Sequence, residues 1–366
     1  GIMMAMGVSA RAACVEVAKA GPEKRTAALK AMAARIRAAA PALMEANKED
    51  MAAATVKGIS GAMLDRLELN ASRIEAMAKG IEDVAGLPDP VGSVMATWTR
   101  PNGLEISRVR GPIGVIGIIY ESRPNVTADA GALCLRAANA AILRGGSESL
   151  KSSRAIAECL RAGLADAGLP QDAIQLVQTP DRAAVGHLLS GLGGKLDVVV
   201  PRGGKSLVAR VQDEARVPVI GHLEGLCHTY IHEKADPAKA EAIIVNAKLR
   251  RVGVCGSTET MLIDASIAPT LLPRLAKALE AAGCELRGDE RARAIHPMTA
   301  ATEDDWTTEY LAPILSVAVV DGLEGAMAHI ARYGSQHTEC IVTEDDSAAE
   351  RFLAEVDSAI VMRNAS

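Results

Sequence analysis

Residues 112–147, "PIGVIGIIYESRPNVTADAGALCLRAANAAILRGGS", decide the fold class. The apolar runs at residues 113–120 and 140–145 are typical of fully buried strands, and the alanine-rich stretch between them has the composition of a helix. A strand, a helix and a second strand in this order favour a parallel pair joined by a crossover helix. This stretch therefore predicts an α/β fold.

The same alternation continues along the chain. Upstream, helical apolar spacing covers about 23–40, 41–57 and 71–85, and Asn102-Gly103 between two alternating segments predicts a hairpin near 95–110. Downstream, further strands are predicted at 173–178, 196–201 and 217–220, and then in a second series at 227–232, 259–264, 314–320, 339–343 and 359–363. We therefore expect two doubly wound parallel-sheet domains plus a small β element.

Domain boundaries follow from these two series of strands. We predict a first domain at 1–225 with a helical N-terminal region, a second domain at 226–362, and the start of a further C-terminal arm at 363–366. No low-complexity linker separates the two series, so we expect a sizeable interface with a substrate cleft.

Composition excludes several classes of protein. The net charge is -5 without long runs of one sign, and aromatic residues make up 2%, which argues against nucleic-acid and acidic-membrane binding. No apolar run reaches the roughly 18 residues of a membrane span. Seven scattered cysteines without CxxC pairs, and the absence of HxxxH spacing among the histidines other than His228, predict reduced thiols, no metal site and a cytoplasmic protein.

Two glycine loops follow predicted strands and precede helices. One contains Gly145-Gly146-Ser147, and the other contains Arg202-Gly203-Gly204 followed by Lys205-Ser206. Glycine lets the backbone approach an anion, and a helix N-terminus supplies N–H groups with partial positive charge. Neither loop matches GxGxxG or GxxxxGK[ST], and each alone is as well explained by a tight turn. Two such loops on one sheet favour a phosphate-bearing cofactor.

Cys255 is the leading candidate for a nucleophile. It lies in "RRVGVCGSTET", residues 250–260, in a loop between a predicted helix and a predicted strand, with basic residues before it and glycines on both sides. A reactive thiol needs access and nearby positive charge. A buried structural thiol is nevertheless the commoner role for a cytosolic cysteine. Cys227 is the only rival, and its neighbour His228 should point to the opposite face of a strand.

The residues quoted above, with "VVVPRGGKSL" and "VNAKLRRVGVCGSTETMLI", resemble the γ-glutamyl phosphate reductase family, also called glutamate-5-semialdehyde dehydrogenases, of the aldehyde dehydrogenase superfamily. The resemblance covers nearly the whole chain. It implies an aldehyde-dehydrogenase-like fold, a homo-oligomer that uses the hairpin, and NADPH-dependent reduction of L-glutamyl 5-phosphate to glutamate 5-semialdehyde in proline biosynthesis. It also implies a possible partnership with a glutamate 5-kinase.

The resemblance assigns roles to individual residues. Cys255 matches the nucleophile that forms a thioester, and Asn125 matches the asparagine that forms an oxyanion hole with the Cys255 N–H. Arg144 stands where relatives place a lysine near the adenosine ribose, and a cation there suits the 2′-phosphate of NADPH. Glu309 matches a glutamate that holds the nicotinamide ribose. The cofactor-binding candidates are Arg144, Gly145, Gly146, Ser147, Arg202, Gly203, Gly204 and Glu309.

Two departures from the superfamily bear on the chemistry. His222 stands where hydrolytic aldehyde dehydrogenases carry a glutamate base, which suits an enzyme that must not hydrolyse its thioester, although Glu224 follows closely. The family continues for about fifty residues beyond Ser366, in a segment that normally completes the catalytic cleft and an oligomerisation arm. We count His222 and Arg123 as substrate-binding candidates, with Arg123 as a ligand for the α-carboxylate; a purely structural role for Arg123 is equally plausible.

Two other functions stay open from the sequence. One is a nucleotide-binding scaffold that has lost its chemistry, which the joint presence of Cys255, Asn125 and Glu309 argues against. The other is a different acylating or aldehyde-oxidising member of the superfamily that acts on another small acid.

Overall fold

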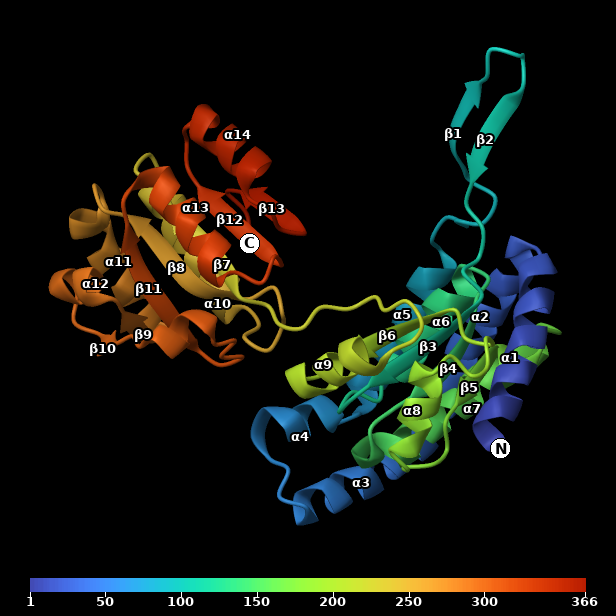
Figure 1. The fold of residues 1–366 in the computed structure, drawn as a ribbon. Helices are drawn as coiled ribbons and strands as arrows, with labels where there is room; N and C mark the ends of the chain where they lie inside the picture. Colours follow the sequence, from blue (N-terminus) through green and yellow to red (C-terminus); the bar gives the residue numbers. More distant parts are fainter. The chain divides into compact units, whose positions relative to one another are not determined.

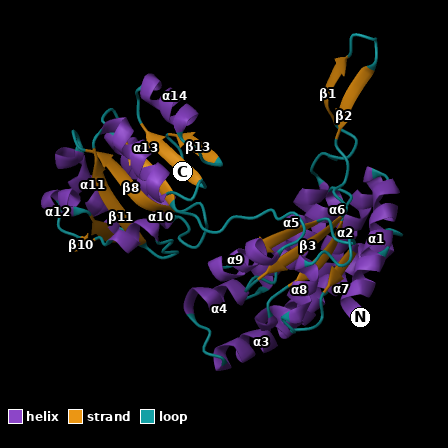
Figure 2. Cartoon of the chain, in the orientation of Figure 1, coloured by secondary structure: helices purple, strands orange, loops and turns teal.

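The structure is a computed structural model that describes residues 1–366, apart from the side chain of Ala62. The chain divides into two compact units, Gly1–Gly221 and His222–Ser366. The predicted boundary was residue 225. Figures 1 and 2 show that each unit is built around its own sheet with helices packed on it.

The first unit contains a four-stranded parallel sheet in the order β5-β4-β3-β6. Its strands are β3 (Val115–Tyr120), β4 (Ala140–Arg144), β5 (Ile174–Leu176) and β6 (Val198–Arg202). Its helices are α1 (Ile2–Lys19), α2 (Pro22–Ala38), α3 (Ala40–Val56), α4 (Gly61–Leu67), α5 (Ala71–Ala85), α6 (Val126–Arg136), α7 (Leu150–Asp166), α8 (Ala183–Leu189) and α9 (Lys205–Glu214), with 3₁₀ turns η1 (Ser147–Ser149) and η2 (Gln171–Ala173).

Side-chain alternation along β3 explains why helices cover both faces of this sheet. Ile116, Ile118 and Tyr120 enter a core with α2, α5, α6 and α7, whereas Val115 and Ile119 enter a second core with α1 and α8. All six residues of β3 are buried. A continuous apolar run is therefore the expected sequence of a strand that is covered on both sides.

Residues 217–220 are the one predicted strand of this unit that does not form. They contribute only an isolated parallel bridge between Val199 and Val219. Pro218 supplies no N–H to a ladder, which explains why this short run stays irregular.

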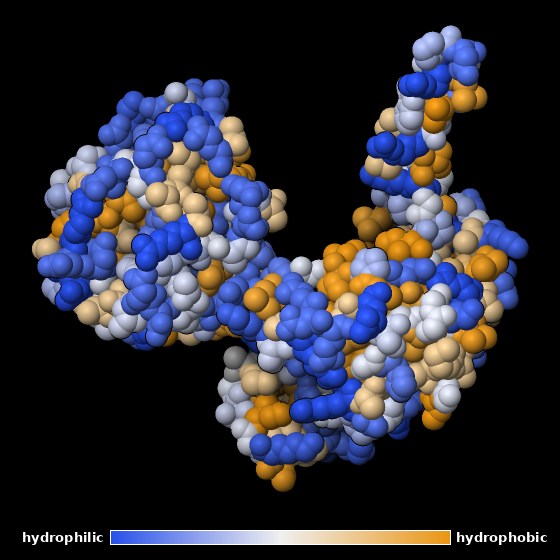
Figure 3. Space-filling view, viewed as in Figure 1, coloured by the Kyte–Doolittle hydropathy of each residue, from blue (hydrophilic) through white to orange (hydrophobic). Residues whose placement is uncertain are grey.

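The predicted hairpin consists of β1 (Val94–Thr99) and β2 (Glu105–Val109), which pair antiparallel. Almost all of its side chains are exposed, including Val94, Met95, Trp98 and Val109. Figure 3 shows apolar side chains along this hairpin. An exposed apolar ribbon of this kind is typical of a surface that another chain covers.

The second unit contains a seven-stranded parallel sheet in the order β10-β9-β11-β8-β7-β12-β13. Its strands are β7 (Cys227–Ile231), β8 (Thr258–Asp264), β9 (Glu285–Gly288), β10 (Thr299–Ala300), β11 (Ile314–Val320), β12 (Thr338–Val342) and β13 (Ile360–Arg363). Its helices are α10 (Pro237–Leu249), α11 (Ala268–Ala281), α12 (Glu290–Ile295), α13 (Gly322–Tyr333) and α14 (Asp346–Glu355), with a 3₁₀ turn η3 (Glu303–Thr307).

Helices again cover both faces, since Met261 and Ile263 of β8 pack with α10 and α11 while Leu262 packs with α13 and α14. The short strands β9 and β10 were not predicted, because four residues and two residues are too few to show an alternation. Among the residues that the structure describes, no helix has the length and apolarity needed to cross a bilayer.

Candidate active site

The candidate catalytic residues of the second unit converge on the amino edge of its sheet. Glu309, Cys255, His222 and His337 lie in the loops that precede β11, β8, β7 and β12. These four strands are consecutive neighbours in the sheet. Ligands of open parallel sheets usually bind at the carboxyl ends of the strands. This unit instead gathers its reactive groups at the opposite edge.

The Cys255 loop connects α10 to β8. Two hydrogen bonds from side chains to main-chain carbonyls, and a close contact with Gly225, hold it in place. Ser257 Oγ donates to the carbonyl of Lys248 at 3.1 Å, where α10 ends. Cys227 Sγ donates to the carbonyl of Cys255 at 3.1 Å. A Cβ atom on Gly225 would lie 1.9 Å from the same carbonyl oxygen, so only glycine allows this approach. The main chain at Cys255 is therefore fixed, while its side chain is partly exposed.

Two histidines lie beside the Cys255 thiol. The Cys255 sulfur and one ring nitrogen each of His222 and His337 all lie within 4.8 Å of one another. The two imidazole rings meet edge to face at 4.8 Å between centroids. Thr338 Oγ1 lies 2.7 Å from His337 Nδ1 and orients that ring. We call these three residues the Cys–His₂ cluster. An imidazole that approaches the thiol to hydrogen-bond distance can take its proton.

Glu309 lies close to this cluster. Its Oε1 accepts the N–H of Gly225 at 3.1 Å, which ties the loop before β11 to the loop before β7. Burial raises the pKa of Glu309 above its usual value, while the Gly225 N–H and the positive forms of His222 and His337 oppose that rise. The carboxylate therefore adds negative charge beside the two imidazoles.

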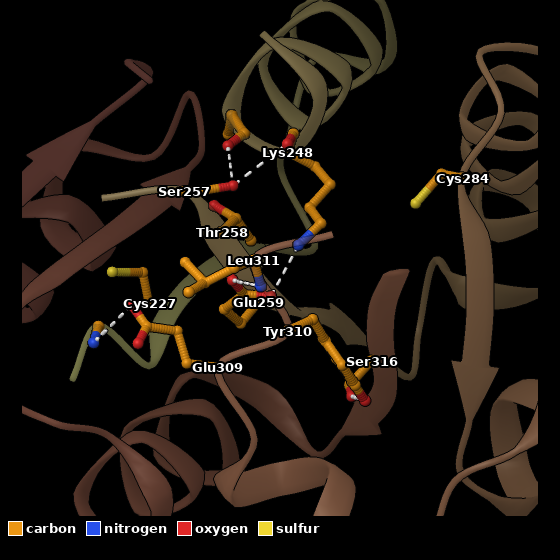
Figure 4. A network of polar contacts seen from close by, with 12 residues as sticks. Cys227, Lys248, Ser257, Thr258, Glu259, Cys284, Glu309, Tyr310, Leu311 and Ser316 are labelled. Atoms are coloured by element: carbon orange, nitrogen blue, oxygen red, sulfur yellow. Dashed lines mark hydrogen bonds and ion pairs between the residues drawn. The ribbon is translucent and has the colours of Figure 1, made fainter. Parts of the chain in front are cut away.

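A buried ion pair lies at the base of the Cys255 loop and close to the Glu309 loop before β11 (Figure 4). Lys248 Nζ lies 2.7 Å from Glu259 Oε2, and both side chains are almost completely buried. Lys248 belongs to α10 and Glu259 to β8, so the pair closes the base of the Cys255 loop. The other oxygen of Glu259 accepts the N–H of Leu311 at 3.5 Å, beside Glu309. Burial raises the pKa of Glu259 to about 7, against the opposing charge of Lys248.

The remaining six cysteines are buried. Burial raises the pKa of Cys134 to about 12 and that of Cys284 and Cys340 to about 11, and it raises the pKa of Cys227 still further. Raised thiol pKa values leave little reactive thiolate. His228 does not serve Cys227, because its Nδ1 is bound to Glu339 at 2.9 Å.

The predicted residues of the first unit lie at the carboxyl edge of its own sheet. Asn125 is the N-cap residue of α6, after β3, and its Nδ2 donates to Asp129 at 3.1 Å. Arg123 lies two residues before it and is half-buried. The loop with Gly145, Gly146 and Ser147 follows β4, and the loop with Arg202, Gly203 and Gly204 follows β6. Because β4 and β6 flank β3, the structure brings these residues to one edge.

The side chains of Glu121 and Arg144 form hydrogen bonds with the backbone of these loops. Glu121 Oε2 accepts the N–H of Gly204 at 3.1 Å, so an anionic oxygen already lies at the start of α9. Arg144 is buried and donates to the carbonyls of Gly145 at 2.5 Å and Pro180 at 3.0 Å. Arg144 therefore braces its own turn in addition to bringing positive charge there. The roles assigned to these residues and to Cys255, Glu309 and His222 stay predictions.

Sequence reasoning missed His337 and the pairing of Lys248 with Glu259, since Lys248 was counted only among the basic residues near Cys255. His337 carries no local signal, since its partners are far away in the chain and only the sheet order brings them together. Lys248 and Glu259 could have been suspected, because two opposite charges stand on either side of the Cys255 loop in otherwise apolar segments.

The chain is similar to known proteins. Residues 4–305 match the model of the aldehyde dehydrogenase family. The chain belongs to this family. The predicted aldehyde-dehydrogenase-like fold is thereby confirmed.

Several γ-glutamyl phosphate reductases of this family are similar to the chain, which confirms the resemblance stated above. The chain is 65% identical over 365 residues to the one from Hyphomonas neptunium and 64% identical over 367 residues to the one from Rhodospirillum rubrum, covering 100% of this chain and 85% and 86% of those proteins. The crystal structure of the γ-glutamyl phosphate reductase of Thermotoga maritima matches with a TM-score of 0.96 and 40% identity, over 100% of this chain and 88% of that one.

Proposed function

We propose that this chain reduces L-glutamyl 5-phosphate to L-glutamate 5-semialdehyde and phosphate, with NADPH as reductant and a thioester on Cys255 as intermediate. The relatives at 56–65% identity, all named γ-glutamyl phosphate reductases, support the overall reaction. The observation that carries the mechanism is the partly exposed Cys255 thiol beside two imidazoles.

The proposed reaction begins when an imidazole of His222 or His337 takes the proton of the Cys255 thiol. The thiolate then attacks the γ-carbonyl carbon, and the bond from this carbon to the phosphate oxygen breaks. Asn125 and the N–H of Cys255 stabilise the oxyanion, and donors of this kind contribute about 3–4 kcal/mol. NADPH, when bound, supplies the hydride that reduces the thioester. Proton return from the imidazole to the sulfur then releases the aldehyde.

The residues of the first unit fit a phosphate-bearing cofactor. The Gly204 N–H donates to the Glu121 carboxylate, which a phosphate would have to displace, and Gly203 leaves room that a Cβ atom would fill, 2.7 Å from the same carboxylate oxygen. We propose that the loops at residues 145–147 and 202–204 bind the phosphates of NADPH, that Arg144 favours its 2′-phosphate, and that Glu309 binds its nicotinamide ribose. In Arg144→Gln, the ratio of kcat/KM for NADPH to that for NADH should fall. An unchanged ratio would remove Arg144 from this role.

Substrate recognition and assembly belong to the same proposal. Arg123 and His222 would bind the glutamyl moiety, so Arg123→Ala should raise KM, and unchanged KM and kcat would exclude that role for Arg123. The exposed apolar hairpin would bury its side chains in a cytoplasmic homo-oligomer, so Trp98→Ser should lower the mass measured by sedimentation. Because an acyl phosphate hydrolyses in water, a glutamate 5-kinase is the partner that would supply it.

The decisive experiment is the reverse reaction. NADP⁺ reduction with glutamate 5-semialdehyde should require phosphate in the wild-type chain and should be lost in Cys255→Ala. Cys284→Ala is the matched control, because Cys284 is buried in the apolar core of the same unit. Activity without phosphate, or activity retained without Cys255, would contradict the proposal.

A further inference from the structure

The three side chains of the Cys–His₂ cluster carry the donor atoms of a transition-metal site. A thiolate and two imidazoles, contributed by three loops, are ligands that suit zinc and its neighbours. Zinc sites with three protein ligands keep the fourth position open for a small molecule. The sequence predicted no metal site because these residues have no short-range ligand spacing, and the order of β7, β8 and β12 in the sheet brings them together.

The distances require a small contraction on binding. Zn–S and Zn–N bonds of about 2.3 and 2.0 Å place tetrahedral ligand atoms roughly 3.5 Å apart. The three atoms lie within 4.8 Å of one another, so no pair has to approach by more than about 1.3 Å. His222 is exposed and Cys255 is partly exposed, so their side chains have room to turn. His337 is held by Thr338 Oγ1 at 2.7 Å, and outer-shell bonds of this kind orient metal-binding histidines.

The surroundings of the cluster favour a cation. Glu309 lies near both imidazoles, and Glu224 adds a second negative charge to the same region. These carboxylates lower the energy of a divalent ion more than that of the metal-free cluster. The cluster also has the single sulfur ligand that separates zinc, cobalt and copper from magnesium and calcium, which prefer oxygen ligands alone.

We propose that His222, Cys255 and His337 form a binding site for Zn²⁺ and similar transition-metal ions, and that an ion bound there blocks Cys255. Binding replaces the thiol proton by the metal, so one proton is released and the sulfur lone pair enters the metal–sulfur bond. That lone pair is then no longer available to attack an acyl phosphate. Metal binding itself does not depend on the proposed reaction, whereas the inhibition rests on it.

Cobalt gives a direct test, because a thiolate bound to Co²⁺ produces an intense near-ultraviolet charge-transfer band. The purified chain titrated with CoCl₂ should develop this band, and ZnCl₂ should remove it by displacement. Cys255→Ser should abolish the band, and His337→Gln should weaken Co²⁺ binding by at least about 10-fold. Cys284→Ser is the control that should keep the band, and circular dichroism should show that each variant is folded.

Two outcomes would overturn the site. One is the absence of a band at millimolar Co²⁺, and the other is a band that persists in Cys255→Ser, which would assign the sulfur to another cysteine such as Cys227. A second readout uses no substrate either: ZnCl₂ should slow alkylation of Cys255 by iodoacetamide, and EDTA should restore the rate, whereas MgCl₂ should have no effect. Zinc binding without loss of turnover would contradict the inhibition alone. An inactive chain that still binds Co²⁺ through Cys255 would count against the proposed function and not against the metal site.

Discussion

Cys255 and Cys227 lie next to each other and differ in burial, although His337 Nδ1 also lies 3.7 Å from Cys227 Sγ. Cys227 begins β7, is 1% exposed, and has a pKa that burial raises far above its usual range. Cys255 lies in a loop with its side chain partly exposed and two imidazoles beside it. The Cys227 thiol donates to the carbonyl of Cys255, so one cysteine helps to fix the backbone of the other. The position in a strand or in a loop therefore decides which thiol can react.

The two cysteines also differ in what supports them. Cys227 is held by the strand ladder of β7 with β8 and β12. The Cys255 loop has no ladder of its own and depends on the Lys248–Glu259 ion pair at its base. A loop that must leave its side chain accessible cannot be stabilised by covering that side chain. The buried Lys248–Glu259 ion pair at the base of the loop stabilises it instead.

The largest predicted difference between the two cysteines is their rate of alkylation. With iodoacetamide near neutral pH, Cys255 should react while Cys227 stays unmodified, because burial removes both access and thiolate from Cys227. Mass spectrometry of peptides from partially alkylated, folded protein measures both rates. Guanidinium should abolish the difference, which provides the control. Equal alkylation rates in the folded protein would show that burial does not make Cys227 less reactive than Cys255.

Breaking the Lys248–Glu259 ion pair should have the next largest effect. At pH 8, Lys248→Met should lower the free energy of unfolding by about 3–5 kcal/mol, because it leaves the Glu259 carboxylate buried without a partner. The double variant Lys248→Met, Glu259→Leu should recover most of this loss, since neither charge then remains. Denaturant unfolding of both variants measures the effect. A Lys248→Met protein as stable as wild type would show that the pair does not hold the loop.

The sequence predicted the strands of both sheets well wherever a run was long and covered on two faces, as at residues 113–120 and 314–320. It failed at residues 217–220, where a proline removes a ladder donor, and at β9 and β10, which are too short to show a pattern. Cys255 could be proposed as a nucleophile because its glycines and cations are adjacent in the sequence. His337 could not be placed beside it, because that proximity depends on which strands are neighbours.

The ionisation of Glu259 should make stability depend on pH. Its pKa is raised by burial from 4.5 to about 7, so the folded chain binds more protons than the unfolded chain between these values. Below about pH 4.5 the free energy of unfolding is not reduced by Glu259. As the pH rises to about 7, ionisation of Glu259 lowers the free energy of unfolding by up to about 3 kcal/mol. Unfolding free energies across this range should fall more steeply in wild type than in Glu259→Gln. Parallel pH profiles would show that Lys248 keeps Glu259 ionised throughout.

The smallest predicted effect is that of removing Cys227 itself. Cys227→Ala deletes one buried sulfur and the bond to the Cys255 carbonyl, which should cost about 1–2 kcal/mol of stability. Because the Cys255 backbone is also confined by Gly225 and by the Ser257 bond, kcat should stay within about 10-fold of wild type. Thermal unfolding and the phosphate-dependent assay measure the two quantities separately. A loss of turnover as complete as that in Cys255→Ala, in a protein that remains folded, would mean that Cys227 takes part in the chemistry and that burial alone does not separate a structural thiol from a reactive one.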